Sequence, residues 1–273
     1  MEVSKVSVSR EGRVRCVAVL RMSFGAKAGN LFNPKFIAAF HKALDQIEQD
    51  PEFDGVVVTG GGKYFSNGLD TKWLGANGVW AAQMVVSSYR LLARLMQLGL
   101  PTVAAINGHA IGAGFFLALC CDHRIMVSDL SSFMLLPELD LGMPLSPGYA
   151  AIVKCKLPQQ AMRTTVLTAK RWTPTQAQSA GIVDRIFGQS AGELVEECVS
   201  FASELAGSSN RVRKRNVYSM LKREIYSECY EALTSWWMLP RMVATLVHMQ
   251  ILGRYVPKRR RKAKTTGHPR SKL

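Results

Sequence analysis

The sequence contains no long apolar run and no cysteine pattern that is typical of metal binding. No apolar stretch approaches the roughly 20 residues that a helix needs to cross a bilayer, and the first residues, MEVSKVSVSREGR, lack the apolar segment of a secretory signal. The six cysteines include no CxxC pair and no ordered spacing with the five histidines. We therefore expect a soluble, intracellular protein with no membrane span, no metal and no disulfide framework, whose cysteines are reduced core residues.

Acidic residues are missing from the end of the chain. Residues 254–273, RYVPKRRRKAKTTGHPRSKL, hold nine Lys and Arg and no Asp or Glu, so residues 1–253 keep only +6 of the formal charge of +15. We interpret this segment as a flexible, solvated basic tail. Its only aromatic residue is Tyr255, which leaves little for base stacking. Nucleic acid is therefore not an expected partner, although the tail and residues 211–223 could bind RNA or CoA phosphates by charge alone.

The last three residues, Ser271, Lys272 and Leu273, match the C-terminal peroxisomal address. They lie at the end of a polar segment, where an import receptor can reach them. The sequence therefore predicts a peroxisomal import receptor as a partner and a location in a peroxisome or a peroxisome-like organelle such as a glycosome.

Strands and helices alternate along the first half of the chain. Hydrophobic periodicity predicts strands at 14–22, 54–60, 101–108, 123–128 and 132–136, and helices at 33–50, 81–99 and 112–122. From Pro147 onward the pattern turns helical, with expected helices at 147–156, 158–169, 173–180, 190–207, 211–235 and 239–252. This alternation is typical of an α/β fold with a mainly parallel sheet. We expect a core at 1–190, a C-terminal helical region at 191–253 and the tail at 254–273.

A single glutamate lies in the apolar stretch LLPELDLGMP at residues 135–144. An acid among leucines and methionine loses hydration, which raises its pKa towards the range useful for proton transfer, so Glu138 is a candidate catalytic base. The alternative is that a Glu after Pro starts a helical turn or lies at a strand edge facing water. Asp140 is a rival base, although an aspartate before Leu-Gly is more simply a turn residue.

Two glycine-bearing turns follow expected strands, YFSNGLD at 64–70 and NGHAIGAG at 107–114. A helix that begins near Gly112 presents unpaired N–H groups and the positive end of its dipole. A second N–H from the turn at Gly68 and Leu69 could complete a two-donor pocket for an oxyanion. The alternative is that these glycines only permit turns and close packing.

At these residues the sequence resembles the crotonase family, the enoyl-CoA hydratases and isomerases. The resemblance covers roughly residues 10–190 and rests on five segments in order: FSNGLD, PTVAAINGHAIGAG, CDHRI, PELDLG and TAKRWTPTQAQSAGIVDRIF. It implies a spiral core of ββα turns, a helical C-terminal region used for trimer formation, and acyl-CoA substrates. It also implies a homotrimer or a dimer of trimers, and no separate cofactor, because CoA arrives attached to the substrate.

The resemblance implies roles for individual residues as well. The thioester oxygen would bind between backbone N–H groups at positions that match Leu69 and Ala113, while Glu138 matches one of the family's two glutamates. The second glutamate of the hydratases is replaced here by Phe116, which would exclude the water that hydration needs. The residues expected to contact the substrate are Ser66, Asn67, Gly68, Asp70, Gly112 and Phe116.

These features favour an isomerase. One carboxylate is enough to move a proton from C2 to C4 of a 3-enoyl-CoA and produce 2-trans-enoyl-CoA for β-oxidation, and FSNGLD with PELDLG looks most like the peroxisomal-type monofunctional enoyl-CoA isomerases. The alternatives are a hydratase, a decarboxylase, a thioester hydrolase, a noncatalytic RNA- or CoA-binding protein, or a dienoyl-CoA isomerase, whose extra acids would be sought at Phe116 and Ser146. We interpret His109, and the tryptophans and methionines between residues 236 and 249, as packing or interface residues.

Overall fold

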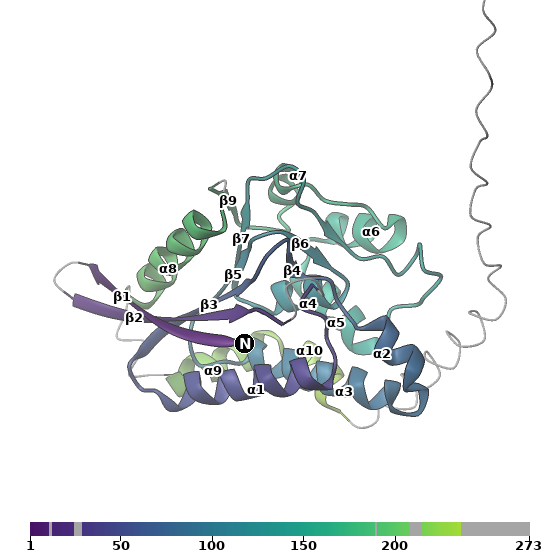
Figure 1. Ribbon diagram of the computed structural model, residues 1–273, viewed down its shortest axis with the longest axis horizontal. Coiled ribbons are helices and arrows are strands. Elements are labelled where there is room, and N and C mark those ends of the chain that lie inside the picture. Colours follow the sequence, from purple (N-terminus) through teal and green to yellow (C-terminus); the bar gives the residue numbers. More distant parts are fainter. Residues whose placement is uncertain (11–12, 25–28, 189, 208–214, 236–273) are drawn as a thin grey trace, which may run out of the picture.

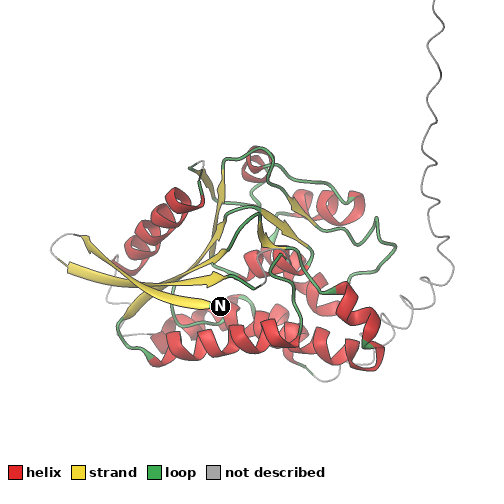
Figure 2. Ribbon diagram, in the orientation of Figure 1, coloured by secondary structure: helices red, strands yellow, loops and turns green. Residues whose placement is uncertain are grey.

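The computed structural model describes residues 1–10, 13–24, 29–188, 190–207 and 215–235 (Figures 1 and 2). These residues form two β-sheets. The large sheet has the order β1-β2-β3-β5-β7-β9, with β1 and β2 antiparallel and the other neighbours parallel. Its strands are β1 (Glu2–Arg10), β2 (Arg13–Met22), β3 (Phe53–Gly60), β5 (Thr102–Ile106), β7 (His123–Val127) and β9 (Arg185–Phe187). The small sheet is parallel and has the order β4 (Tyr64–Ser66), β6 (His109–Ile111), β8 (Met134–Leu135).

Helices cover both faces of the large sheet. Figure 1 shows α8 on one face and α1, α3, α9 and α10 on the other, with α4 beside the small sheet. The helices of the described residues are α1 (Pro34–Gln49), α2 (Thr71–Ala76), α3 (Gly78–Met96), α4 (Ala113–Cys120), α5 (Pro147–Lys156), α6 (Gln159–Thr168), α7 (Pro174–Ser179), α8 (Ala191–Gly207), α9 (Arg215–Ile225) and α10 (Ser227–Thr234). Within those residues no helix is long and apolar enough to span a membrane.

Because successive side chains of a strand alternate between faces, the large sheet packs against one hydrophobic cluster on each face. On β2, Val17 and Val19 pack into the cluster beneath α8, while Ala18 and Leu20 point into the larger cluster on the opposite face. Adjacent side chains of a strand point to opposite faces, and a parallel sheet covered on both sides therefore needs continuous apolar runs. The buried run of β3 satisfies the same requirement.

The expected α/β architecture with a helical C-terminal part is confirmed, and the differences are local. The predicted helix at 211–235 was wrong as a single element, because the described chain forms α9 and α10 on either side of Tyr226. The predicted strand at 132–136 shortens to β8. The expectation missed β1, β4, β6, β9 and α2, which are short or lie at a sheet edge. The expected helix at 239–252 and the tail at 254–273 lie outside the described residues.

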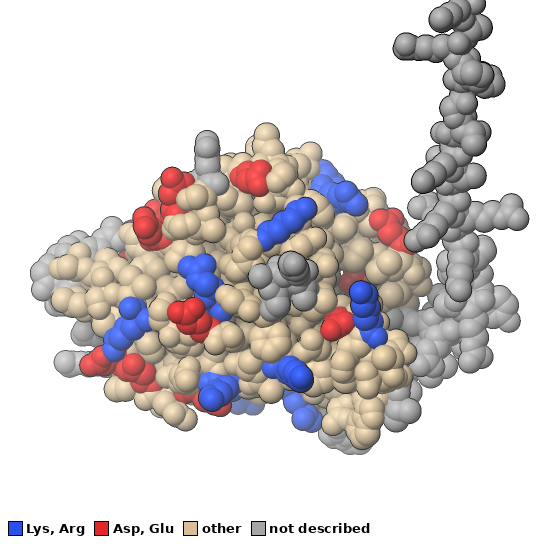
Figure 3. Space-filling view, viewed as in Figure 1, with Lys and Arg blue, Asp and Glu red and all other residues tan. Residues whose placement is uncertain are grey.

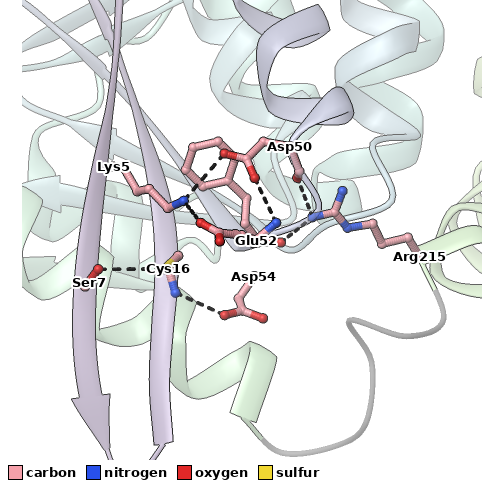
Figure 4. A network of polar contacts seen from close by, with 8 residues as sticks. Lys5, Ser7, Cys16, Asp50, Glu52, Asp54 and Arg215 are labelled. Carbon is pink, nitrogen blue, oxygen red and sulfur yellow. Dashed lines mark hydrogen bonds and ion pairs between the residues drawn. The ribbon is translucent and has the colours of Figure 1, made fainter.

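Ion pairs and hydrogen bonds connect β1 and α9 to the loop between α1 and β3, residues 50–52, and to the first residue of β3 (Figure 4). Lys5 of β1 forms ion pairs with Asp50 and Glu52. Arg215, at the start of α9, donates hydrogen bonds from Nη2 to the carbonyl oxygens of Asp50 at 2.9 Å and Phe53 at 2.5 Å. The contacts of Arg215 join segments more than 160 residues apart in the sequence. One short loop thus connects the beginning of the fold to its C-terminal helices.

Candidate active site

The carboxyl ends of the three parallel strands of the small sheet lie at one edge, and each leads into a segment singled out from the sequence. Strand β4 leads into the turn at Asn67–Leu69, β6 leads into Gly112 and α4, and β8 leads into Pro137 and Glu138. The pairings of Ser66 with Ala110 and of Ile111 with Leu135 set their register. Parallel pairing therefore brings together residues that are up to 71 positions apart, from Asn67 to Glu138.

Hydrogen bonds hold the first turn, residues 67–69, in place. The hydroxyl of Ser66 is fully buried, donates to Asn30 O at 2.8 Å and accepts from the Gly68 N–H at 3.2 Å. Phe32 N donates to Gly68 O at 2.8 Å, and Asp70 N donates to Phe32 O at 2.9 Å. Because the carbonyl and N–H of a trans peptide point in opposite directions, the Leu69 N–H is directed away from Phe32.

The second turn opens a buried helix. Gly112 adopts φ +52° and ψ −119° as the N-cap of α4, and its own N–H donates to Leu135 O at 2.9 Å. Ala113 is the first residue of this helix, where the N–H has no partner within the helix. In the part of the chain that the structure describes, no carbonyl group accepts a hydrogen bond from the backbone N–H of Leu69 or of Ala113.

The two turns approach so closely that only glycine fits. Gly68 has φ +84°, and a Cβ added there would lie 2.7 Å from Ile111 O and 3.1 Å from Ala113 N. A Cβ added at Gly114 would lie 2.3 Å from Ser66 O. These glycines therefore do more than permit a turn, because they let the Leu69 and Ala113 amides come together at the positive end of the α4 dipole.

Glu138 lies in the turn that follows β8, next to the second glycine turn. A Cβ added at Gly112 would be 3.9 Å from Pro137 Cδ, so the segment before Glu138 borders the start of α4. Backbone hydrogen bonds from Leu141 N to Pro137 O and from Met143 N to Glu138 O hold the turn. The chain therefore fixes the backbone of the carboxylate without using its side chain.

The side chain of Glu138 is in an environment suited to a base. Its Oε2 is buried and has no hydrogen-bond partner among the described residues. Burial raises the pKa of the carboxyl above its usual value of 4.5, against a smaller opposing effect of a hydrogen bond from its own backbone N–H. The carboxyl is thus desolvated in the direction expected, although Leu139 and Leu141 beside it in the chain are exposed.

Asp140 does not share this environment. It lies in the turn formed by residues 138–142 and is exposed, whereas Glu138 is half-buried. The argument that residues two apart face the same side requires an extended segment, and β8 ends at Leu135. The turn therefore separates the two carboxylates, in agreement with the simpler interpretation of Asp140 as a turn residue.

Phe116 lies in the first turn of α4 and packs against an aromatic residue of α5. It is fully buried, and its ring stacks on Tyr149 of α5 with centroids 4.3 Å apart and an interplanar angle of 7°. The Tyr149 hydroxyl is 2.9 Å from Ser88 Oγ, and the Tyr89 hydroxyl donates to Ser146. Burial raises the pKa of Tyr149, with a contribution from the negative charge of Glu138. Phe116 and Tyr149 thus form a neutral aromatic pair, of which Tyr149 is near enough to Glu138 for the charge of the carboxylate to affect its pKa.

The other residues expected at the substrate have different surroundings. Asn67 is exposed beside the first turn. Asp70 caps α2 by accepting from Trp73 N at 3.0 Å, and it also accepts from Asn33 Nδ2 at 3.3 Å. Its side chain thus fixes the following helix rather than the Gly68 turn. His109 is buried and packs against Phe133 with ring centroids 4.2 Å apart and the rings tilted by 37°, in line with its interpretation as a packing residue.

Sequence reasoning missed Asn30, Phe32 and Tyr149. Asn30 has φ +52° and its side chain donates to the carbonyls of Tyr64 and Phe65, so it holds β4 in place. The Gly-Asn pair at 29–30 was a usable turn signal, because asparagine tolerates positive φ. Phe32 and Tyr149 act through partners distant in sequence and had no such signal.

The described residues form no large patch of one charge on the face of the molecule in Figure 3. Figure 3 shows Lys and Arg interspersed with Asp and Glu over the visible face. Within the described ranges no group of three or more His, Cys, Asp and Glu side chains could hold a metal ion. The predicted address at Ser271, Lys272 and Leu273, and the tryptophans and methionines after residue 235, lie outside those ranges.

Comparison with known proteins adds a family and several named relatives. The family model described as enoyl-CoA hydratase/isomerase matches residues 15–239. Enoyl-CoA delta isomerase 3 of Arabidopsis thaliana is 35% identical over 205 residues, which cover 72% of this chain and 84% of that protein. The peroxisomal enoyl-CoA delta isomerase 1 of the same plant is 32% identical over 199 residues, covering 72% and 81%.

Two further similarities extend the range of named reactions. Carnitinyl-CoA dehydratase of Salmonella typhi is 33% identical over 193 residues, covering 70% of this chain and 72% of that protein. The crystal structure of a probable enoyl-CoA hydratase from Mycobacterium tuberculosis H37Rv matches with a TM-score of 0.74 at 24% identity, covering 92% of this chain and 98% of that one. This structural likeness shows the fold and leaves the reaction open.

Proposed function

The chain belongs to the enoyl-CoA hydratase/isomerase family, and from this premise we propose that it converts 3-enoyl-CoA to 2-trans-enoyl-CoA. The observation that carries the proposal is the buried carboxylate of Glu138 beside the two glycine turns. Among the described residues, neither its Oε2 nor the backbone N–H groups of Leu69 and Ala113 have a hydrogen-bond partner. Two relatives named as enoyl-CoA delta isomerases support the same reaction.

The proposed chemistry begins with the acidity of the substrate. A proton on C2 of a thioester is too weakly acidic for a carboxylate unless the enolate oxygen is stabilised as it forms. The Leu69 and Ala113 amides supply two donors for that oxygen, and one such donor is typically worth about 3 kcal/mol in the transition state. Glu138 removes the C2 proton as a general base and returns it to C4 as a general acid. The double bond moves by one position with no net change in protonation.

Phe116 distinguishes this reaction from hydration in the proposal. Addition of water requires a second group to orient and deprotonate the water, and the position that the hydratases fill with glutamate holds a ring stacked on Tyr149. An apolar wall offers that water no hydrogen-bond acceptor. The relative named as a dehydratase makes hydration or dehydration of an acyl-CoA the second candidate.

The cofactor requirement, assembly and location complete the proposal. The reaction is redox-neutral and its activating group is the thioester, so no separate cofactor is needed. We propose a homotrimer or a dimer of trimers built with the C-terminal helical region. The SKL terminus, together with relatives named as peroxisomal, supports import into a peroxisome or a related organelle such as a glycosome.

The test is conversion of 3-enoyl-CoA to 2-trans-enoyl-CoA by the purified full chain, beside hydration of 2-trans-enoyl-CoA. We expect isomerisation with little hydration, and a loss of about 10²- to 10⁴-fold in Glu138→Gln. Asp140→Asn is the matched control, because Asp140 is an exposed carboxylate on the same turn. Activity lost in Asp140→Asn and retained in Glu138→Gln would reverse the assignment, and hydration as the dominant reaction would favour the second candidate.

A further inference from the structure

Two thiols on the neighbouring helices α5 and α10 have no role in the proposed reaction. All six cysteines are described and carry free thiols. Four are buried and Cys16 is half-buried, whereas Cys155 on α5 is exposed. The expectation that the cysteines are core residues is therefore wrong for Cys155. Its neighbour is Cys229 on α10, which is only 2% exposed.

The fold brings these two sulfur atoms together. Helices α5 and α10 pack against each other, and Cys155 and Cys229 lie close enough for each to shift the pKa of the other. Both cysteines line a hollow of about 470 Å³, whose wall also includes Lys154 and Glu228. A small reagent can thus reach the sulfur of Cys155, while the sulfur of Cys229 lies next to it.

The surroundings distinguish Cys155 chemically from the other thiols. A hydrogen bond with Cys229 lowers the pKa of Cys155 to about 7, helped by Lys156 and opposed by burial and by Glu228. The same hydrogen bond, together with burial, raises the pKa of Cys229. Burial raises the pKa of Cys121 to about 12, and also raises that of Cys120 and Cys198. Since the thiolate is the nucleophile, Cys155 is the reactive member of the set.

We propose that Cys155 and Cys229 are a redox-active pair that hydrogen peroxide converts reversibly into an intramolecular disulfide. The Cys155 thiolate attacks one peroxide oxygen, the O–O bond breaks, and the departing hydroxide takes up a proton, leaving a sulfenic acid. The Cys229 sulfur then attacks the Cys155 sulfur, the S–O bond breaks, and water leaves with the Cys229 proton. Two thiols and one peroxide become one disulfide and two waters, and a dithiol reductant reverses the change.

The disulfide would crosslink α5 to α10 where these two helices already pack closely. A Cβ added at Gly148 would lie 2.8 Å from the Tyr89 ring and 3.0 Å from Leu233 Cδ2 of α10. Helix α5 also begins at Pro147, shortly after the Glu138 turn, and carries Tyr149. Oxidation would therefore crosslink the helix that carries Tyr149 to the last described helix, whichever reaction the site catalyses.

The experiment treats the reduced full chain with hydrogen peroxide at pH 7 and maps its peptides by mass without reduction. We expect one crosslink, between Cys155 and Cys229, with the loss of two hydrogens and of two alkylatable thiols, both restored by dithiothreitol. The oxidised protein should unfold at a higher temperature than the reduced protein, because the crosslink restricts the unfolded chain.

Three variants separate the pair from the other thiols. Cys155→Ser should remove the crosslink and the thermal shift. Cys229→Ala should stop Cys155 at the sulfenic acid, which dimedone traps, and should slow its formation at pH 7. Cys16→Ser is the matched control, because Cys16 is the other thiol that is not fully buried, and it should leave the crosslink intact. A wild-type Cys155 that stays a thiol, bridges to another cysteine, or goes to a sulfinic acid without bridging would overturn the proposal.

Discussion

Desolvation of Glu138 has a direct consequence for the pH dependence of catalysis. The base must be ionised, and burial raises its pKa above 4.5. As the pH falls through that raised pKa, the fraction of active enzyme falls, so kcat/KM should decline at a higher pH than an exposed glutamate would give. A profile of kcat/KM against pH measures this, and an acid limb centred at or below 4.5 would contradict the assignment of Glu138 as the base.

The proposed oxyanion site depends on the backbone conformation of Gly68. The substitution Gly68→Ala places a Cβ 2.7 Å from Ile111 O at a positive φ of 84°, so the turn must shift and move the Leu69 amide. We expect a fall in kcat of about 10²-fold or more, the effect of losing one oxyanion donor. Steady-state kinetics on folded protein, checked by circular dichroism, measures it.

Gly75 provides the control for that substitution. It lies in α2, and a Cβ added there would meet no atom within 4 Å. Gly75→Ala should therefore leave kcat unchanged and stabilise the fold by about 0.5–1 kcal/mol, because alanine loses less backbone entropy in a helix. Equal losses of activity in both variants would argue against a special role for the Gly68 turn.

At the scale of elements, one buried ion pair holds α9 against the core. Lys222 is 3% exposed, and its Nζ lies 2.8 Å from Asp122 Oδ2 and donates to the carbonyls of Leu98 and Leu100. Asp122 also accepts from the N–H and hydroxyl of Thr102. This cluster joins α9 to the start of β5 and to the segment between α4 and β7.

Removal of the lysine should be costly. In Lys222→Met the Asp122 carboxylate loses its cation while it stays largely buried, and breaking a buried pair in this way destabilises by about 3 kcal/mol or more. Urea unfolding measures the loss. Arg223→Met is the matched control, since Arg223 is exposed on the same helix and should change stability by less than about 0.5 kcal/mol. Similar losses in the two variants would refute the anchoring role of Lys222.

The position of the small sheet also belongs to this scale. Turn signals in the sequence predicted the segments that follow β4 and β6, but the strands themselves are three residues long and were missed. Strands this short are defined by pairing, which joins Tyr64 to His109 and Ala110 to Met134. No local propensity within three residues can specify partners 24 to 45 positions away.

At the scale of the whole molecule, the testable property is targeting by the C-terminal tripeptide. Deletion of Ser271, Lys272 and Leu273 should move a tagged protein from the organelle to the cytosol, because the import receptor reads the free C-terminal tripeptide. The purified truncated protein should keep its activity. Fluorescence microscopy beside a peroxisomal marker measures location, and unchanged targeting of the truncated protein would reject the prediction.

The basic tail serves as the control at this scale. Replacing the three arginines at 259–261 with glutamine reduces the positive charge without touching the tripeptide. Import should persist in that variant if the address alone is recognised. Loss of import would instead implicate the charge of the segment.

Some properties of this protein could be predicted from the sequence, because they depend on residues that are neighbours in the chain. The glycine turns at Gly68 and Gly112 and the buried helix from Ala113 are local patterns, and the structure has them where they were expected. The burial of Glu138 was expected too, but Leu139 and Leu141 beside it are exposed, so that burial depends on the fold. Other properties required the folded chain, because they arise between distant residues. Parallel pairing gathers the three site segments at one edge, Phe116 stacks on Tyr149, and Cys155 meets Cys229. Side-chain chemistry and turn preference act over a few residues, whereas packing decides which of those residues meet.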